Sequence, residues 1–202
     1  MIKKIALGLV AGSLLSGCAS QQTAMDFSRF GDVQLGQWGG GVNAQAVKSV
    51  AFAHPSAGDV DQDKLAACVA ENVTNRGVTL SDTAGSHFGT YTGNYYQQSN
   101  QHSVGGGSVI VREGSGNIVA EGITEYSASA LVKRAVRFTM TAQLGESGNV
   151  YRFSNLEQAQ LNSGAVANSG FDKIGAWQGA NPDLALVSLE QLSSNIDNCI
   201  KR

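Results

Sequence analysis

The stretch VRFTMTAQL, residues 136–144, has an apolar residue at every second position. Successive side chains of a strand point to opposite faces of a sheet, so this alternation is typical of a strand with one buried face. Such one-sided burial is common in antiparallel sheets, whereas parallel sheets are covered on both faces. The stretch therefore predicts a half-buried antiparallel strand.

Neighbouring segments extend this strand into a sheet. Residues 108–112 and 118–127 precede it and residues 150–156 follow it, each with the composition of a strand. Residues 114–117 (GSGN) and 146–149 (ESGN) supply turn residues that tolerate positive φ. Consecutive strands joined by short turns predict an antiparallel β-meander.

One amphipathic helix is predicted before the meander, at about residues 61–76. Leu65, Cys68 and Val69 recur there at the spacing of one helical face. Acidic residues at the start and Gly77 just after the end are typical helix boundaries. Cys68 is therefore expected to point inward.

A second amphipathic helix is predicted to close the chain. It is expected to begin at Asn181, with Pro182 in its first turn, where proline is favoured. An apolar run at 47–53 predicts a further strand, which ends at His54 and leads into the first helix. The whole order predicts an α+β fold, an antiparallel sheet with two helices packed on one face. The buried stripe of the second helix comprises Leu186, Leu189, Leu192, Ile196 and either Cys199 or Ile200.

The first residues of the chain resemble a bacterial lipoprotein signal. Lys3 and Lys4 precede an apolar run at 5–15 that is too short to span a bilayer as a permanent helix. The order Leu15-Ser16-Gly17-Cys18 matches the lipobox, in which the cysteine is acylated and becomes the new N-terminus. The resemblance covers residues 1 to about 20 and indicates no specific family for the rest. An ordinary secretory signal, in which the cysteine is incidental, is the alternative.

By this resemblance, residues 1–17 form a signal peptide and Cys18 carries the lipid. Residues 18–44 are then a tether that is docked in part, and residues 45–202 form a single periplasmic α+β domain. Several acyl chains anchor a protein stably, since each buried CH₂ contributes about 0.8 kcal/mol. The absence of aspartate directly after Cys18 favours the outer membrane over the inner one. We expect a lipid-anchored protein on the periplasmic face of the outer membrane.

The expected mature chain carries a small negative charge. Removal of Lys3 and Lys4 from the 14 basic residues leaves 12 against 16 acidic residues, a formal charge of −4. A negative surface repels polyanions. Nucleic acid and anionic lipid headgroups are therefore not expected as partners.

Cys68 and Cys199 remain as an even pair once Cys18 is assigned to the lipid, in a compartment that permits disulfides. Each lies on the inward stripe of a predicted helix. A disulfide would close a loop of 131 residues, which the chain-entropy model values at about 5 kcal/mol at most. Two separate buried thiols are the alternative.

Residues 82–107 fit neither the helices nor the meander. They are rich in Gly, Ser, Thr, Asn and Gln and contain Tyr91, Tyr95 and Tyr96. A loop of this length is functional, disordered or paired as an irregular hairpin. The tyrosines and amides suit a binding surface, because tyrosine supplies rigid contact area at a small entropic cost. A variable polar loop or edge hairpin is the alternative.

Trp38 and Trp177 each lie among glycines. Exposed, they would stack on the sugar rings of an envelope glycan. Buried, they would anchor the tether and the approach to the last helix against the sheet, which is the commoner fate of so large an aromatic surface. We expect packing.

No catalytic or metal-binding motif in the sequence is complete. Asp59, Asp61 and Asp63 alternate as in a calcium loop, but Lys64 stands where the turn glycine belongs. Ser147 lies in GESGN, which departs from the nucleophile elbow at its last residue and is typical of a hairpin turn. The three histidines lack the paired spacing of zinc sites: His54, His87 and His102.

These observations predict a membrane-anchored envelope lipoprotein that is not an enzyme and has no cofactor. It would act as an adaptor, or as an assembly or accessory subunit of an envelope complex. Its partners would be the membrane, through the N-terminal lipid, and an envelope protein. The alternative is a glycan- or small-ligand-binding module that uses Trp38, Trp177 or the tyrosines of residues 82–107.

Overall fold

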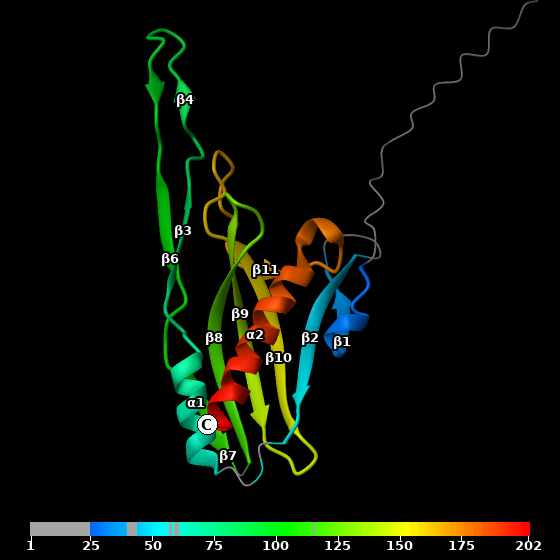
Figure 1. Ribbon diagram of the computed structural model, residues 1–202. Helices are drawn as coiled ribbons and strands as arrows, with labels where there is room; N and C mark the ends of the chain where they lie inside the picture. Colours follow the sequence, from blue (N-terminus) through cyan, green and yellow to red (C-terminus); the bar gives the residue numbers. More distant parts are fainter. Residues whose placement is uncertain (1–24, 40–43, 57, 59–60, 115) are drawn as a thin grey trace, which may run out of the picture.

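The computed structural model describes residues 25–39, 44–56, 58, 61–114 and 116–202. The lipobox, Cys18 and Asp59 lie outside these residues. The described chain is mostly antiparallel sheet with two α-helices, broadly an α+β fold. Figure 1 shows the long strands of the main sheet, with a narrow hairpin that extends beyond them.

The main sheet has seven strands. Six follow the order β1-β2-β10-β9-β8-β7, and the short β11 pairs with the end of β10. Neighbouring strands are antiparallel throughout. The bounds are β1 (Asp32–Gln37), β2 (Gln45–His54), β7 (Ile110–Gly114), β8 (Asn117–Ser127), β9 (Lys133–Gln143), β10 (Asn149–Gln160) and β11 (Asp172–Lys173).

The five strands predicted from the sequence correspond to β2, β7, β8, β9 and β10, with ends that differ by a few residues. In β9 the apolar positions Val136, Phe138 and Met140 are buried, whereas Arg137 and Thr139 on the opposite side are half-buried. The alternation in VRFTMTAQL is therefore reflected in burial.

Strand β1 lies in the part of the sequence that was predicted as a tether. It pairs with β2 at the edge of the sheet, with a register shift between Gln34 and Leu35. The short 3-10 turn before it, Ser28–Phe30, places Phe30 in the core at 2% exposure. Apolar residues at Val33 and Leu35 carry the strand's alternation, but the pattern is too short to separate it from a linker by sequence.

The first helix, α1, runs from Gln62 to Asn72. Asp61 caps it, since its carboxylate accepts a hydrogen bond from the Lys64 amide at 2.7 Å. The prediction that this helix continues to about residue 76 is wrong. Val73 adopts an extended conformation, and the next carbonyl, that of Thr74, accepts a hydrogen bond from the Ile123 amide of β8 at 2.7 Å. The sheet thus takes over backbone groups that a longer helix would use.

The second helix, α2, runs from Pro182 to Ile200, with Asn181 in the left-handed conformation before it. Pro182 therefore occupies the first turn, as predicted. A disulfide joins Cys68 of α1 to Cys199 of α2, with an S–S distance of 2.03 Å and a Cα–Cα distance of 5.7 Å. This confirms the predicted pair, and the alternative of two separate thiols is wrong.

The main hydrophobic core includes side chains of both helices and of the sheet. Leu65 of α1 and Leu189 of α2 are fully buried in it, together with Phe153 of β10. A smaller second cluster joins the base of the projecting hairpin to the sheet: Val78, Leu80, Ile123, Ala135 and Ala159.

Candidate functional site

The segment at 82–107 is paired as a hairpin in the structure. Strand β3 (Val78–Asp82) pairs with β6 (Asn100–Val104), and further out β4 (His87–Phe88) pairs with β5 (Tyr95–Tyr96). We call this ribbon, residues 78–104, the arm. Figure 1 shows it extending past the ends of the main-sheet strands, with β4 near its far end.

The base of the arm is fixed to the body. Leu80 is fully buried in the second hydrophobic cluster. The Ser81 amide donates to the Leu161 carbonyl at 2.8 Å, and the Ser163 amide donates to the Ser81 carbonyl at 3.1 Å. The arm therefore leaves the body as a continuation of paired strands rather than as a free loop.

Asp82 reinforces the same junction. Its carboxylate accepts hydrogen bonds from the Asn100 side chain at 2.7 Å, from the Asn168 amide at 2.9 Å and from the Ala84 amide at 3.0 Å. These donors favour the ionised form, and chiefly those from Asn100 and Asn168 hold the pKa of Asp82 below its ordinary value. The carboxylate thus ties both strands of the arm to the loop that follows β10.

The outer end of the arm is aromatic. Tyr91 is fully exposed at 102%, Phe88 is 71% exposed, and Tyr95 and Tyr96 are 54% and 47% exposed. We call His87, Phe88, Tyr91, Tyr95 and Tyr96 the aromatic tip. Exposed aromatic side chains in such density on a projecting ribbon are a feature of binding surfaces.

The tip side chains pair across the two strands. His87 stacks on Tyr96 with ring centroids 5.4 Å apart, and Phe88 contacts Tyr95 at 5.0 Å. His87 and Phe88 are adjacent in β4, so their pairs lie on opposite faces of the ribbon. Both faces of the tip are therefore aromatic.

The predicted tyrosines are thus brought together at one place. His87 and Phe88 were not predicted to belong with them. The sequence signal is that residues 83–111 contain no Asp, Glu, Lys or Arg, while the aromatic residues cluster near the middle.

Trp38 and Trp177 also meet, although they lie far apart in the sequence. Their rings make an edge-to-face contact with centroids 5.1 Å apart, and both side chains are half-buried. The Trp177 ring lies close over Gly175, where a Cβ would come within 2.3 Å of it. The pair thus packs on the end of the sheet but is not fully enclosed.

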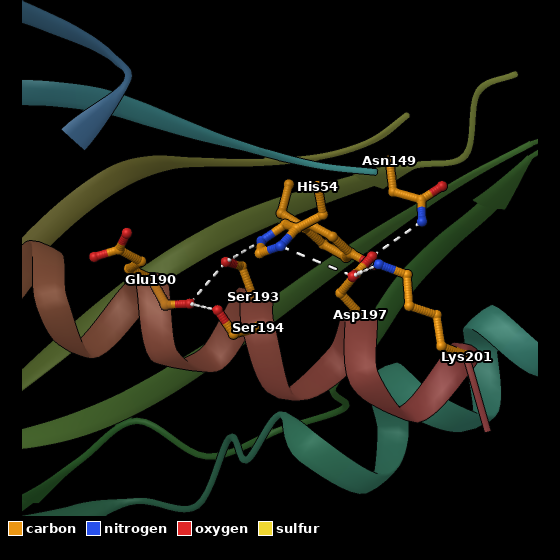
Figure 2. A network of polar contacts seen from close by, with 8 residues as sticks. His54, Asn149, Glu190, Ser193, Ser194, Asp197 and Lys201 are labelled. Carbon is orange, nitrogen blue, oxygen red and sulfur yellow. Dashed lines mark hydrogen bonds and ion pairs between the residues drawn. The ribbon is translucent and has the colours of Figure 1, made fainter. Parts of the chain in front are cut away.

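A polar cluster that is separate from the arm lies between helix α2 and strands β2 and β10 (Figure 2). His54 Nε2 is 2.9 Å from Ser193 Oγ, and His54 Nδ1 is 3.8 Å from Asp197 Oδ2. The side-chain contacts run from serine to histidine to aspartate, as they do in the catalytic triad of serine hydrolases. Sequence reasoning did not find it. The signal was present, because Ser193 and Asp197 are polar residues four apart on the apolar stripe of α2.

The environment of Ser193 favours a structural role. The residue is fully buried, and its hydroxyl lies 2.8 Å from the Glu190 carbonyl, to which it donates. With its proton used there, Ser193 Oγ accepts from His54. A nucleophile must instead reach a substrate and pass its proton to the histidine.

The Asp197 carboxylate interacts chiefly with groups other than His54. It is 2% exposed and accepts hydrogen bonds from Asn149 at 3.0 Å and Tyr151 at 3.4 Å, and it pairs with Lys201 at 2.5 Å. Burial, followed by the nearby Asp197 charge, raises the pKa of Tyr151. The network therefore supplies hydrogen-bond donors to the buried Asp197 carboxylate and joins α2 to β2 and β10.

An open groove of about 720 Å³ crosses the main sheet beside an irregularity in β10. Asn155 lies at this β-bulge with φ 52°, a conformation uncommon for a residue other than glycine. Arg137 pairs with Glu157, and its guanidinium lies 4.8 Å from the centroid of the Phe171 ring. Lys48, Glu121 and Lys173 complete the charged lining.

The remaining candidate sites stay apart. In the described ranges, no three His, Cys, Asp or Glu side chains gather as metal ligands would. Asp61 caps α1, and Ser147 lies in the turn between β9 and β10. No helix in the described part of the chain is long and apolar enough to cross a membrane.

Comparisons with known proteins give no relative for this chain. No protein-family model matches it, and neither the curated proteins nor the solved structures include a significant match.

Proposed function

We propose that this protein is a lipid-anchored envelope adaptor that contacts another envelope component through the aromatic tip of the arm. The lipobox supports acylation of Cys18 and a place on the periplasmic face of the outer membrane. The function is tethering and docking, without catalysis. The domain that carries the arm is an antiparallel meander with two helices on one face, continuous with the docked part of the tether.

The observation that carries the proposal is the contrast between the two ends of the arm. Its base is fastened by Leu80, by the hydrogen bonds of Ser81 and by the Asp82 carboxylate. Its tip exposes Phe88 and Tyr91 to solvent. Exposed aromatic area is costly in water, and a fixed base limits the entropy lost when the tip binds.

The disulfide and the polar network support the same function. The Cys68–Cys199 bond and the Asp197 cluster both stabilise α2 against the rest of the domain. A disulfide agrees with an exported protein. Neither feature offers a reacting group to a substrate, so both serve the stability of the scaffold that holds the arm.

Site-specific photocrosslinking in intact cells tests this function. A photoreactive phenylalanine analogue replaces Tyr91 at the tip or, as the control, Leu131, which is 94% exposed in the turn between β8 and β9. The adaptor function requires a reproducible crosslinked product from position 91 that is missing from position 131. It also requires that Cys18→Ala lower both the retention of the protein on membranes and the yield of the crosslinked product. Equal products, or none, at the two positions would contradict the function.

A second candidate function is the binding of a glycan or small ligand at the groove in the main sheet. The groove combines amide, carboxylate and ammonium groups, which are suited to sugar hydroxyls, and the half-buried Trp38–Trp177 pair lies beyond its Lys173 side. A screen against soluble envelope oligosaccharides tests it, with Asn155→Gly as the groove variant. Binding that survives this change would exclude the groove as the site.

A further inference from the structure

We propose that the aromatic tip inserts into the interfacial layer of a lipid bilayer. This inference rests on the proposed function, since it names the envelope component that the arm contacts. The protein would then touch membrane at two separate places, the N-terminal lipid and the arm.

The distribution of the aromatic side chains supports a bilayer over a protein cleft. The Phe88–Tyr95 and His87–Tyr96 pairs occupy opposite faces of the ribbon, and Tyr91 extends from its end. A cleft in a folded partner covers mainly one face of a ribbon. A bilayer interface surrounds the inserted part on all sides, and it is a preferred environment for tyrosine, whose ring is apolar and whose hydroxyl remains hydrated.

The absence of charge makes shallow insertion inexpensive. No Asp, Glu, Lys or Arg occurs in residues 83–111, which comprise the outer arm, the segment that follows it and the first two residues of β7. Moving a charged group out of water costs free energy, whereas moving aromatic surface out of water is favourable. The arm also has no Lys or Arg to attract anionic headgroups, so its binding would not depend on them.

The backbone of the tip is largely satisfied within the ribbon. The Gly89 amide donates to the Asn94 carbonyl at 2.8 Å, the Gly93 amide to the Gly89 carbonyl at 2.9 Å, and the Asn94 amide to Thr92 Oγ1 at 3.3 Å. Internal pairing lowers the cost of leaving water. The few groups left at the turn restrict insertion to the depth of the headgroups, where water is still present.

A fluorescent probe at the tip tests this contact. Tyr91→Cys is labelled with a polarity-sensitive dye in the protein purified from membranes as the cell processes it. Cys68 and Cys199 are bonded to each other, so they do not react with the dye. Labelling of the unsubstituted chain gives the background from Cys18. Leu131→Cys is the matched control at an exposed apolar position outside the arm.

The labelled proteins are mixed with vesicles of phosphatidylcholine alone or with added phosphatidylglycerol. The inference requires a blue shift at position 91 and quenching by nitroxide-labelled lipids, both absent at position 131. The shift must be the same in both vesicle types and at low and high salt, because no charge pair contributes. It must decrease when Phe88→Ser and Tyr95→Ser are added.

Other results would contradict bilayer insertion or the adaptor function. An unshifted probe at position 91, or equal shifts at positions 91 and 131, would overturn bilayer insertion. If the probe is unshifted while position 91 crosslinks specifically to a protein in cells, the adaptor function stands and the tip binds a protein cleft instead. If the probe at position 91 is unshifted and the same position gives no specific crosslink in cells, the adaptor function is wrong as well.

Discussion

Ser193 Oγ and His54 Nε2 lie 2.9 Å apart although 139 residues separate them in the chain. The contact joins the middle of α2 to the end of β2. Because Ser193 is fully buried and also donates to the Glu190 carbonyl, the pair holds two elements together rather than presenting a nucleophile. This relationship makes the stability of the domain depend on a polar contact inside an apolar interface.

Ser193→Ala is expected to lower the free energy of unfolding by about 1 kcal/mol, because a buried hydrogen bond is lost and His54 loses a partner. Ser194→Ala is the matched control. Its hydroxyl bonds the same Glu190 carbonyl at 2.9 Å but does not contact His54. Urea denaturation of both variants measures the difference. Equal, negligible effects would contradict a stabilising role for the His54 contact.

Removing the disulfide is expected to destabilise the domain. The double variant Cys68→Ala, Cys199→Ala frees a loop of 131 residues in the unfolded chain, and the loss should be about 5 kcal/mol at most. Thermal and urea unfolding, with and without reductant, measure it. The wild type in reductant should approach the double variant, and a double variant with unchanged stability would rule out the bond as a stabilising element.

Asp82 should make the junction of the arm sensitive to acid. Its pKa is lowered in the folded protein by donors from Asn100 and Asn168, so the folded state favours the ionised form. The resulting stability is fully present above the unfolded pKa of about 3.9 and is lost as the pH falls through the lower folded value.

The isosteric variant Asp82→Asn cannot ionise and is the reference for this effect. Unfolding measured from neutral to strongly acidic pH should show the wild type more stable than the variant at neutral pH, with the difference decreasing in acid. A difference that does not change with pH would show that the carboxylate charge contributes nothing at this junction.

Gly175→Ala should displace the Trp177 ring. A Cβ at position 175 would lie 2.3 to 2.6 Å from three atoms of that ring, whereas a Cβ at Gly179 would lie at 3.8 Å from its nearest ring atom. The edge-to-face contact with Trp38 should therefore be lost in Gly175→Ala and kept in Gly179→Ala. Tryptophan fluorescence, read for a shift toward longer wavelength, distinguishes the two. The same spectrum for both would mean that Trp177 does not depend on the space above Gly175.

Local patterns in the sequence determined the secondary structure of much of this protein. The period of two in residues 136–144 reflects a one-sided strand, and the apolar stripe predicted for α2 is buried, with Ile200 rather than Cys199 at its end. Pro182 marked the start of that helix. These features depend on residues within one or two turns or on alternate neighbours, so the sequence alone reveals them.

Long-range contacts decided the rest. The end of α1 depends on a hydrogen bond from Ile123 in β8 to the carbonyl of Thr74, and strand β1 depends on the open edge of β2. The Ser193–His54 contact and the Trp38–Trp177 contact likewise require partners that local patterns do not identify. Each arises when chain segments that are distant in sequence compete for the same backbone groups or buried space, and only the tertiary structure resolves that competition.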